Sequence, residues 1–122
     1  MAAPNIVNVT SIFGKTMGAA LSTTTTTDIL TCGANKVLKV NTIIVSNVDG
    51  TNAADVTVYF YDSSAAARYA LAYTIQVPAD ATLVVIGKDN PIYLEESDQI
   101  EAGASAISDL QIVISYEEID DA

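Results

Sequence analysis

The sequence predicts an all-β fold, an antiparallel β-sandwich of about eight strands that is jelly-roll-like. Three observations support this prediction. Apolar and polar residues alternate with a period of two in short runs along the 122 residues. Turn residues separate these runs about every 8–12 positions, as in sandwich proteins. No long run of residues shows the 3.6-residue period of an amphipathic helix.

The N-terminal part is predicted to contain an extended arm. Residues 1–14 are expected to form this arm or an edge strand, and residues 15–122 a single sandwich domain. Within the arm, residues 6–13 have a strand pattern that Gly14 is expected to end, and residues 15–21 are a weaker extended segment. The threonines of residues 23–27 favour extended backbone because Thr is β-branched.

Residues 36–48 form the longest strand candidate. Apolar residues lie on both predicted faces near its middle, so the strand should be central in its sheet. The predicted faces consist of Leu38, Val40, Ile44 and Val48 on one side, with Ile43 and Val45 on the other.

Further strands are predicted after a turn at Asp49-Gly50. In residues 55–61, Val56, Val58 and Phe60 should share one face. A loop or single turn is expected over residues 62–68. The later strand candidates are residues 71–77, 82–86, 92–94, 99–102 and 110–117, of which the first should place Leu71, Tyr73, Ile75 and Val77 on one face and the last Leu110, Ile112, Ile114 and Tyr116.

The charge composition narrows the function classes. Charged residues make up 16% of the chain, against about 25% in ordinary soluble domains. This shortage indicates that neighbouring subunits cover part of the surface. The net charge of −10 comes from residues 89–122, which contain no basic residue. Nucleic acid and anionic membrane surfaces are therefore not expected partners.

The residue inventory indicates a protein that is not an enzyme. The chain has no His and one Cys, Cys32, so it lacks the residues for the usual hydrolytic triads, zinc sites or an internal disulfide. Cys32 is expected to be a small buried side chain. Glu95, Glu96, Asp98 and Glu101 lie around one turn. Paired carboxylates can hydrolyse glycosides, but a solvated acidic turn is the expected interpretation. We predict no catalytic residue and no cofactor.

Two binding sites remain as alternatives. Asp49, Asn52 and Asp55 are candidate calcium ligands, although turn chemistry explains the same residue types equally well. Tyr59 and Tyr61 could stack on a sugar or on a partner chain, or pack at the edge of the core.

Several sequence phrases resemble small virion proteins of tailed bacteriophages, as found in marine and cyanobacterial phages. The resemblance covers roughly residues 26–119, and its motifs are structural, not catalytic. Ser97 occupies a position where this family has Gly. The phrases are residues 36–41 (KVLKVN), 44–50 (IVSNVDG), 77–83 (VPADATL), 91–96 (PIYLEE) with Asp98, 105–110 (SAISDL) and 115–119 (SYEEI).

The resemblance implies a virion structural protein that is made in the host cytoplasm, above all a capsid decoration or cement subunit that binds the assembled shell. A neck, tail or baseplate component is an alternative, and a carbohydrate-binding β-sandwich module is another. Expected partners are the major capsid protein or other virion proteins, and copies of the chain in a homo-oligomer, with a trimer favoured. Lys39 and Arg68 could pair with acidic residues of a neighbour or within the chain. The interface candidates are Ile6, Val7, Val9, Phe13, Lys39, Tyr59, Tyr61 and Arg68.

Overall fold

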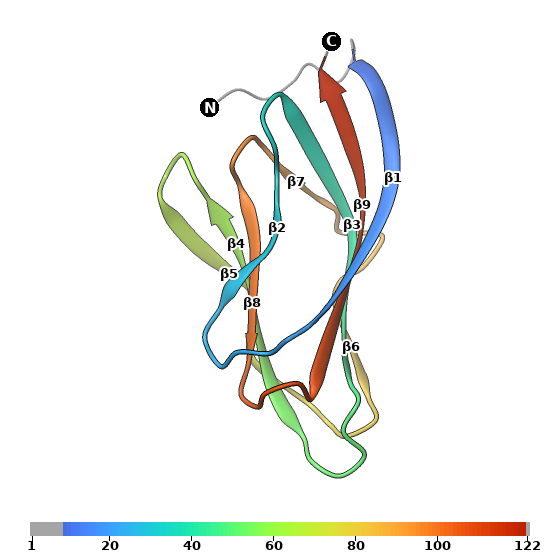
Figure 1. Cartoon of the computed structure of the whole chain (residues 1–122), viewed down its shortest axis with the longest axis vertical. Helices are drawn as coiled ribbons and strands as arrows, with labels where there is room; N and C mark the ends of the chain where they lie inside the picture. Colours follow the sequence, from blue (N-terminus) through green and yellow to red (C-terminus); the bar gives the residue numbers. More distant parts are fainter. Residues whose placement is uncertain (1–8, 122) are drawn as a thin grey trace.

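The computed structural model describes residues 9–121 and contains two antiparallel sheets that pack face to face (Figure 1). The first, called the β3–β9 sheet, has the strand order β1-β9-β3-β6, with β7 also paired to β3. The second, the β4–β8 sheet, has the order β2-β8-β4-β5. The strands are β1 (Val9–Ala20), β2 (Thr27–Thr31), β3 (Lys36–Asn47), β4 (Ala54–Asp62), β5 (Ala67–Val77), β6 (Thr82–Ile86), β7 (Ile92–Leu94), β8 (Gln99–Ala104) and β9 (Leu110–Asp121).

The order of the strands confirms the predicted sandwich and its jelly-roll character. Consecutive strands from β1 to β4 alternate between the two sheets, and β8 and β9 return to central positions in them. Two antiparallel sheets wound in this way form a jelly roll. The chain turns at residues 63–66, within the range 62–68 predicted for a loop or single turn. None of the described residues forms an α-helix, and hence none forms a helix able to cross a membrane.

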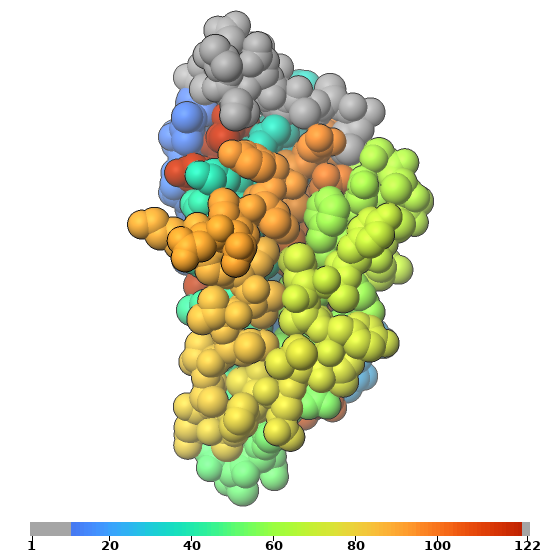
Figure 2. Space-filling view, turned by 180° about the vertical axis from the view of Figure 1, so that it is seen from behind, coloured from blue at the N-terminus to red at the C-terminus, as the bar shows by residue number. Residues whose placement is uncertain are grey.

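Apolar side chains from both sheets fill the space between them. In β9, Leu110, Ile112 and Ile114 are fully buried, as their alternation predicts. Val56 and Val58 of β4 oppose them from the other sheet and are also fully buried. Each such side chain contributes about 1.5–3 kcal/mol to folding. Along one side of the molecule β5 and the β6–β7 segment lie next to each other (Figure 2).

The N-terminal strand differs from its prediction. β1 runs without interruption through Gly14, which pairs with Glu117 of β9, so Gly14 does not end the strand. Pairing with a long neighbour supplies main-chain hydrogen bonds whatever the local propensity of the residue. Residues 9–14 therefore belong to an edge strand, the second of the two predicted possibilities. The interface candidates Ile6 and Val7 lie outside the described residues.

The threonine run is only partly a strand. Thr27 begins β2, whereas residues 23–26 form a loop that crosses β8. The Ala104 amide donates a hydrogen bond to the Thr23 carbonyl across this contact (3.3 Å). β-propensity is overridden here because the loop has to join two different sheets.

A β-bulge in β3 changes which side chains face the core. Val40 pairs with Tyr116 and Thr42 with Ser115, so Asn41 is an extra residue. Beyond it the core-facing residues are Ile43 and Val45, both fully buried. The prediction that Ile44 and Val48 share a face with Leu38 and Val40 was therefore wrong, and Val48 is 52% exposed. The prediction that the strand is central is confirmed.

β5 carries register shifts of the same kind. Val56 of β4 pairs with Ile75, but Val58 pairs with Ala72, which leaves an extra residue in β5. Thr74 lies there with φ of 52°, in the left-handed region. This conformation is an outlier for a β-branched residue and costs about 1–3 kcal/mol. Tyr73 is consequently 65% exposed, and the prediction that it shares a face with the buried Val77 was wrong.

Candidate functional site

The outer surface of the β3–β9 sheet is the first candidate, and we call it the aliphatic face. The strand register aligns Gly18, Val113, Ile44 and Val84 in one row across β1, β9, β3 and β6. Val113 is 37% exposed and Val84 60% exposed. The two flanking rows contain no charged residue and consist of Thr16, Ser115 and Thr42 on one side and Ala20, Gln111, Ser46 and Thr82 on the other.

Small residues keep the aliphatic face shallow at the β1 edge. A hollow of about 290 Å³ lies beside Val113, where Gly18 and Ala20 leave space. A Cβ atom on Gly18 would meet its neighbours at ordinary van der Waals distance, the nearest being the Ile112 carbonyl oxygen at 3.7 Å. Charged residues begin one row beyond Ser115, where Lys39 of β3 lies opposite Glu117. A smooth, uncharged surface of this kind suits broad contact with another protein surface.

The outer surface of the β4–β8 sheet is the second candidate. Unlike the aliphatic face, it carries charged and aromatic side chains. Its centre is an ion pair between the Arg68 Nε and the Glu101 Oε1 (2.8 Å). The Arg68 guanidinium also lies 5.4 Å from the centroid of the Tyr61 ring, a cation–π contact. Glu101 is only 8% exposed, so Arg68 neutralises a carboxylate of its own chain. Of the two pairings considered for Arg68, the structure has the intramolecular one.

Asp28 adds a further carboxylate to this surface. It lies opposite Glu101 on the neighbouring strand β2. Partial burial raises the pKa of Asp28, and the negative charge of Glu101 raises it further. The carboxyl groups around Arg68 therefore make the surface electronegative.

A groove of about 300 Å³ opens on the same surface, and we call it the tyrosine groove. Its walls include the rings of Tyr59 and Tyr73, whose centroids are 6.4 Å apart and whose planes are inclined at 58°. Hydroxyl groups make up most of the remaining lining. The other lining residues are Thr24, Thr26, Asp55, Thr57, Thr74, Gly103, Ala104 and Ser105.

The predicted acidic turn is solvated only in part, because Glu95 is exposed whereas Asp98 and Glu101 are buried. Asp98 is 3% exposed, and its Oδ1 accepts hydrogen bonds from the Ser63 amide (3.0 Å) and the Ser63 hydroxyl (3.2 Å). Its Oδ2 accepts one from the Glu95 amide (3.1 Å). Glu96 accepts a hydrogen bond from the Asn35 amide (2.9 Å). Both carboxylates tie loops together, and around the buried Asp98 the loop N–H groups need such an acceptor.

The loop with the calcium candidates is explained by turn hydrogen bonds. Asp49 accepts from the Thr51 amide (2.9 Å) and from the Asn52 side-chain amide (3.2 Å), and these contacts hold the pKa of Asp49 below its usual range. The buried Asn47 donates to the carbonyl groups of Asn52 and Val77. Asp55 lies apart from this network, in the tyrosine groove. No group of three His, Cys, Asp or Glu within the described residues could hold a metal ion.

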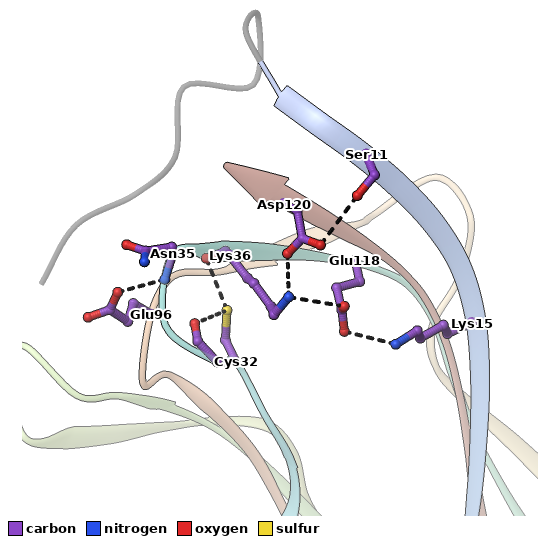
Figure 3. A network of polar contacts seen from close by, with 9 residues as sticks. Ser11, Lys15, Cys32, Asn35, Lys36, Glu96, Glu118 and Asp120 are labelled. Atoms are coloured by element: carbon purple, nitrogen blue, oxygen red, sulfur yellow. Dashed lines mark hydrogen bonds and ion pairs between the residues drawn. The ribbon is translucent and has the colours of Figure 1, made fainter. Parts of the chain in front are cut away.

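An ionic network closes one end of the sandwich (Figure 3). Glu118 pairs with Lys15 (3.1 Å) and with Lys36 (3.4 Å), and Lys36 also pairs with Asp120. The hydrogen bond from Lys36 lowers the pKa of Asp120. The Ser11 hydroxyl donates to Asp120 (3.3 Å). Part of the acidic C-terminal region thus joins β1, β3 and β9 and is not free for a partner.

Cys32 lies next to this network in the chain's interior. It is 2% exposed, and its thiol donates to the Lys36 carbonyl (3.2 Å). Burial raises the pKa of Cys32 to about 11. The group therefore stays a protonated thiol at neutral pH, in agreement with the predicted buried side chain.

The remaining interface candidates are scattered. Phe13 is 50% exposed on β1, and Lys39 is half-buried on β3. Val9 pairs with Asp121 at the beginning of β1. Tyr59 and Tyr61 lie on the outer side of β4, but only Tyr59 lines the groove. The sequence patterns did not indicate Tyr73, Val84 and Val113 as surface candidates. Bulges and cross-strand register determine where these side chains lie, and a single sequence segment shows neither the bulges nor the register.

No family model and no curated protein matches this sequence. Among solved structures, a chain described with Bacillus endospore appendages, a novel family of disulfide-linked pili, has a similar fold. The TM-score is 0.54 at 13% sequence identity, and the superposition covers 92% of this chain and 90% of the other. At this identity the likeness concerns the fold alone.

Proposed function

We propose that this protein is a structural subunit of a bacteriophage virion, a decoration or cement protein that binds the assembled capsid shell through its aliphatic face. The virion assignment comes from the sequence resemblance. The observation that supports a docking function is the uncharged row of Gly18, Val113, Ile44 and Val84 across four strands. A monomeric protein usually places charged residues on such an outer sheet face.

The proposed contact is non-covalent. The appendage chain with a similar fold is described as part of disulfide-linked pili. In this chain Cys32 is buried and protonated, so it is a poor partner for an intermolecular disulfide. Shape and apolar area would have to supply the affinity, and an interface of standard size buries roughly 800 Å² per partner.

The test is binding of the purified protein to heads assembled from the major capsid protein of the same phage, measured by cosedimentation and by electron microscopy. Val113→Glu should weaken binding at least about tenfold, because a carboxylate would be buried without a partner. Its matched control is Ile107→Glu, which adds the same charge at a loop residue that is 64% exposed and lies outside the aliphatic face.

Unchanged binding by Val113→Glu would exclude the aliphatic face as the docking surface. Absence of the wild-type protein from heads, with density on the neck or tail, would overturn the decoration assignment. Circular dichroism of both variants should match that of the wild type, since both sites are exposed.

A further inference from the structure

We propose that the tyrosine groove is a binding site for a neutral oligosaccharide, which stacks on the rings of Tyr59 and Tyr73. The two rings form adjoining inclined walls, 6.4 Å between centroids and 58° between planes. Tyr73 is 65% exposed, so the face of its ring is available. The apolar C–H face of a pyranose ring loses water when it packs on an aromatic ring, which favours the complex.

The rest of the lining matches the polar edges of a sugar. Thr24, Thr26 and Ser105 bring hydroxyl groups, each able to donate and to accept a hydrogen bond. The carboxylate of Asp55 accepts no hydrogen bond from any residue between 9 and 121, so it can accept from sugar hydroxyls. The volume of about 300 Å³ is at the lower end of small-molecule sites, which span about 300–1,000 Å³. It therefore suits one or two sugar rings of a longer chain.

Charge selects a neutral ligand. No Lys or Arg is among the described residues that line the groove, and Asp55 is. Arg68, on the same outer surface, is already paired with Glu101. A phosphate, sulfate or carboxylate group would meet the Asp55 carboxylate here and no cationic side chain among the described lining residues. The net charge of −10 adds a long-range repulsion against polyanions.

The backbone that shapes the groove contains a bulge, a strained residue and a close approach of a loop to a strand. The bulge in β5 turns Tyr73 outward, and the strained Thr74 amide donates to the Thr57 hydroxyl (3.1 Å), which holds the bulge in place. On the opposite wall, Gly103 lets the threonine loop approach β8, since a Cβ there would lie 2.9 Å from the Thr25 carbonyl carbon. Bulges that re-aim a side chain and strained residues held by their surroundings are concentrated at functional sites.

The groove and the aliphatic face are on the outer sides of different sheets. A subunit attached through the aliphatic face would therefore present the groove away from the contact. The sugar site does not depend on the virion assignment, and loss of one binding activity leaves the other measurable.

The test uses the ¹⁵N-labelled full chain titrated with maltohexaose, cellohexaose, chitohexaose and mannohexaose, followed by NMR chemical shifts. At least one of these should shift the amides of Thr57, Thr74 and Gly103 with a millimolar or lower Kd. Tyr73→Ala should weaken that binding at least about tenfold. The matched control Tyr69→Ala removes a 57% exposed tyrosine of the same strand that does not line the groove, and should bind within about twofold of wild type.

A second variant, Asp55→Asn, keeps the size of the side chain and should weaken binding through loss of a charged acceptor. Binding of none of the four sugars, equal loss in Tyr73→Ala and Tyr69→Ala, or shifts confined to residues outside the groove would overturn the proposal. Preference for a sulfated glycan or for an extended peptide over the neutral sugars would overturn it as well.

Discussion

The two outer faces of this sandwich differ although the sheets share one architecture. On the aliphatic face the register of β1, β9 and β3 is unbroken through the rows on either side of Val113. The result is a smooth surface of small and aliphatic side chains. On the opposite sheet two register shifts interrupt the pairing of β4 with β5, and a groove with aromatic walls opens beside them. Regular pairing of these three strands leaves an uncharged hollow lined by small and aliphatic residues, whereas the bulged pairing turns Tyr73 outward as a wall of the aromatic groove.

The glycines of the two faces provide the largest expected difference. Gly103→Ala should lower the free energy of unfolding by about 2 kcal/mol, because the new Cβ would overlap the backbone of the threonine loop. Gly14→Ala on β1 has no atom within 4 Å of the new Cβ and should be neutral or slightly stabilising, by about 0.5 kcal/mol. Urea unfolding of the two variants measures this contrast. Equal stabilities would mean that the loop gives way easily and does not form a fixed wall.

Backbone strain provides a smaller difference. Thr74→Gly should raise the free energy of unfolding by about 0.5 kcal/mol, because relief of the left-handed conformation exceeds the entropy cost of glycine. Thr16→Gly, at a strand position of ordinary φ on the aliphatic face, should lower it by about 1 kcal/mol. Thermal unfolding at matched conditions distinguishes the two signs. A loss of stability in Thr74→Gly as large as that in Thr16→Gly would show that Thr74 is not strained.

The electronegative surface around Glu101 provides the smallest expected difference. Because burial and Glu101 hold the folded-state pKa of Asp28 above its ordinary value, ionisation of this carboxyl group costs stability as the pH rises from the unfolded to the folded pKa. Asp28→Asn should therefore stabilise the protein near pH 7 by about 0.3 kcal/mol, a value discounted for solvent exposure. The gain should vanish near pH 3, where the carboxyl group is protonated in both states. Melting temperatures at the two pH values measure it, and a gain that persists at low pH would show that the charge of Asp28 is not its source.

The C-terminal strand shows what a local sequence pattern can predict about burial. Leu110, Ile112 and Ile114 recur at every second position, and the structure buries all three as predicted. The turn at residues 63–66 and the short strand at 92–94 also follow from their residue types. No extra residue interrupts the two-residue period of these strands, and the turn depends on its own residue types, so composition and spacing are sufficient.

The site could not be predicted in the same way. Tyr61 was paired with Tyr59 as a possible sugar platform, but Tyr61 contacts Arg68 and Tyr73 takes its place beside Tyr59. The bulge that exposes Tyr73 depends on the pairing of β5 with β4, which lies outside the segment itself. Likewise, Asp98 looks like a surface residue until the Ser63 turn is placed over it.

Local residue patterns were sufficient to predict that the chain forms strands, where most of the turns lie and which side chains fill the core in regular strands. The reason is that a period of two and turn chemistry act over a few residues. The neighbours of each strand, the positions where an extra residue shifts the faces and the carboxylates that become buried are features of the folded chain alone. Those features arise from hydrogen bonds between segments far apart in the chain, whose partners no local pattern specifies.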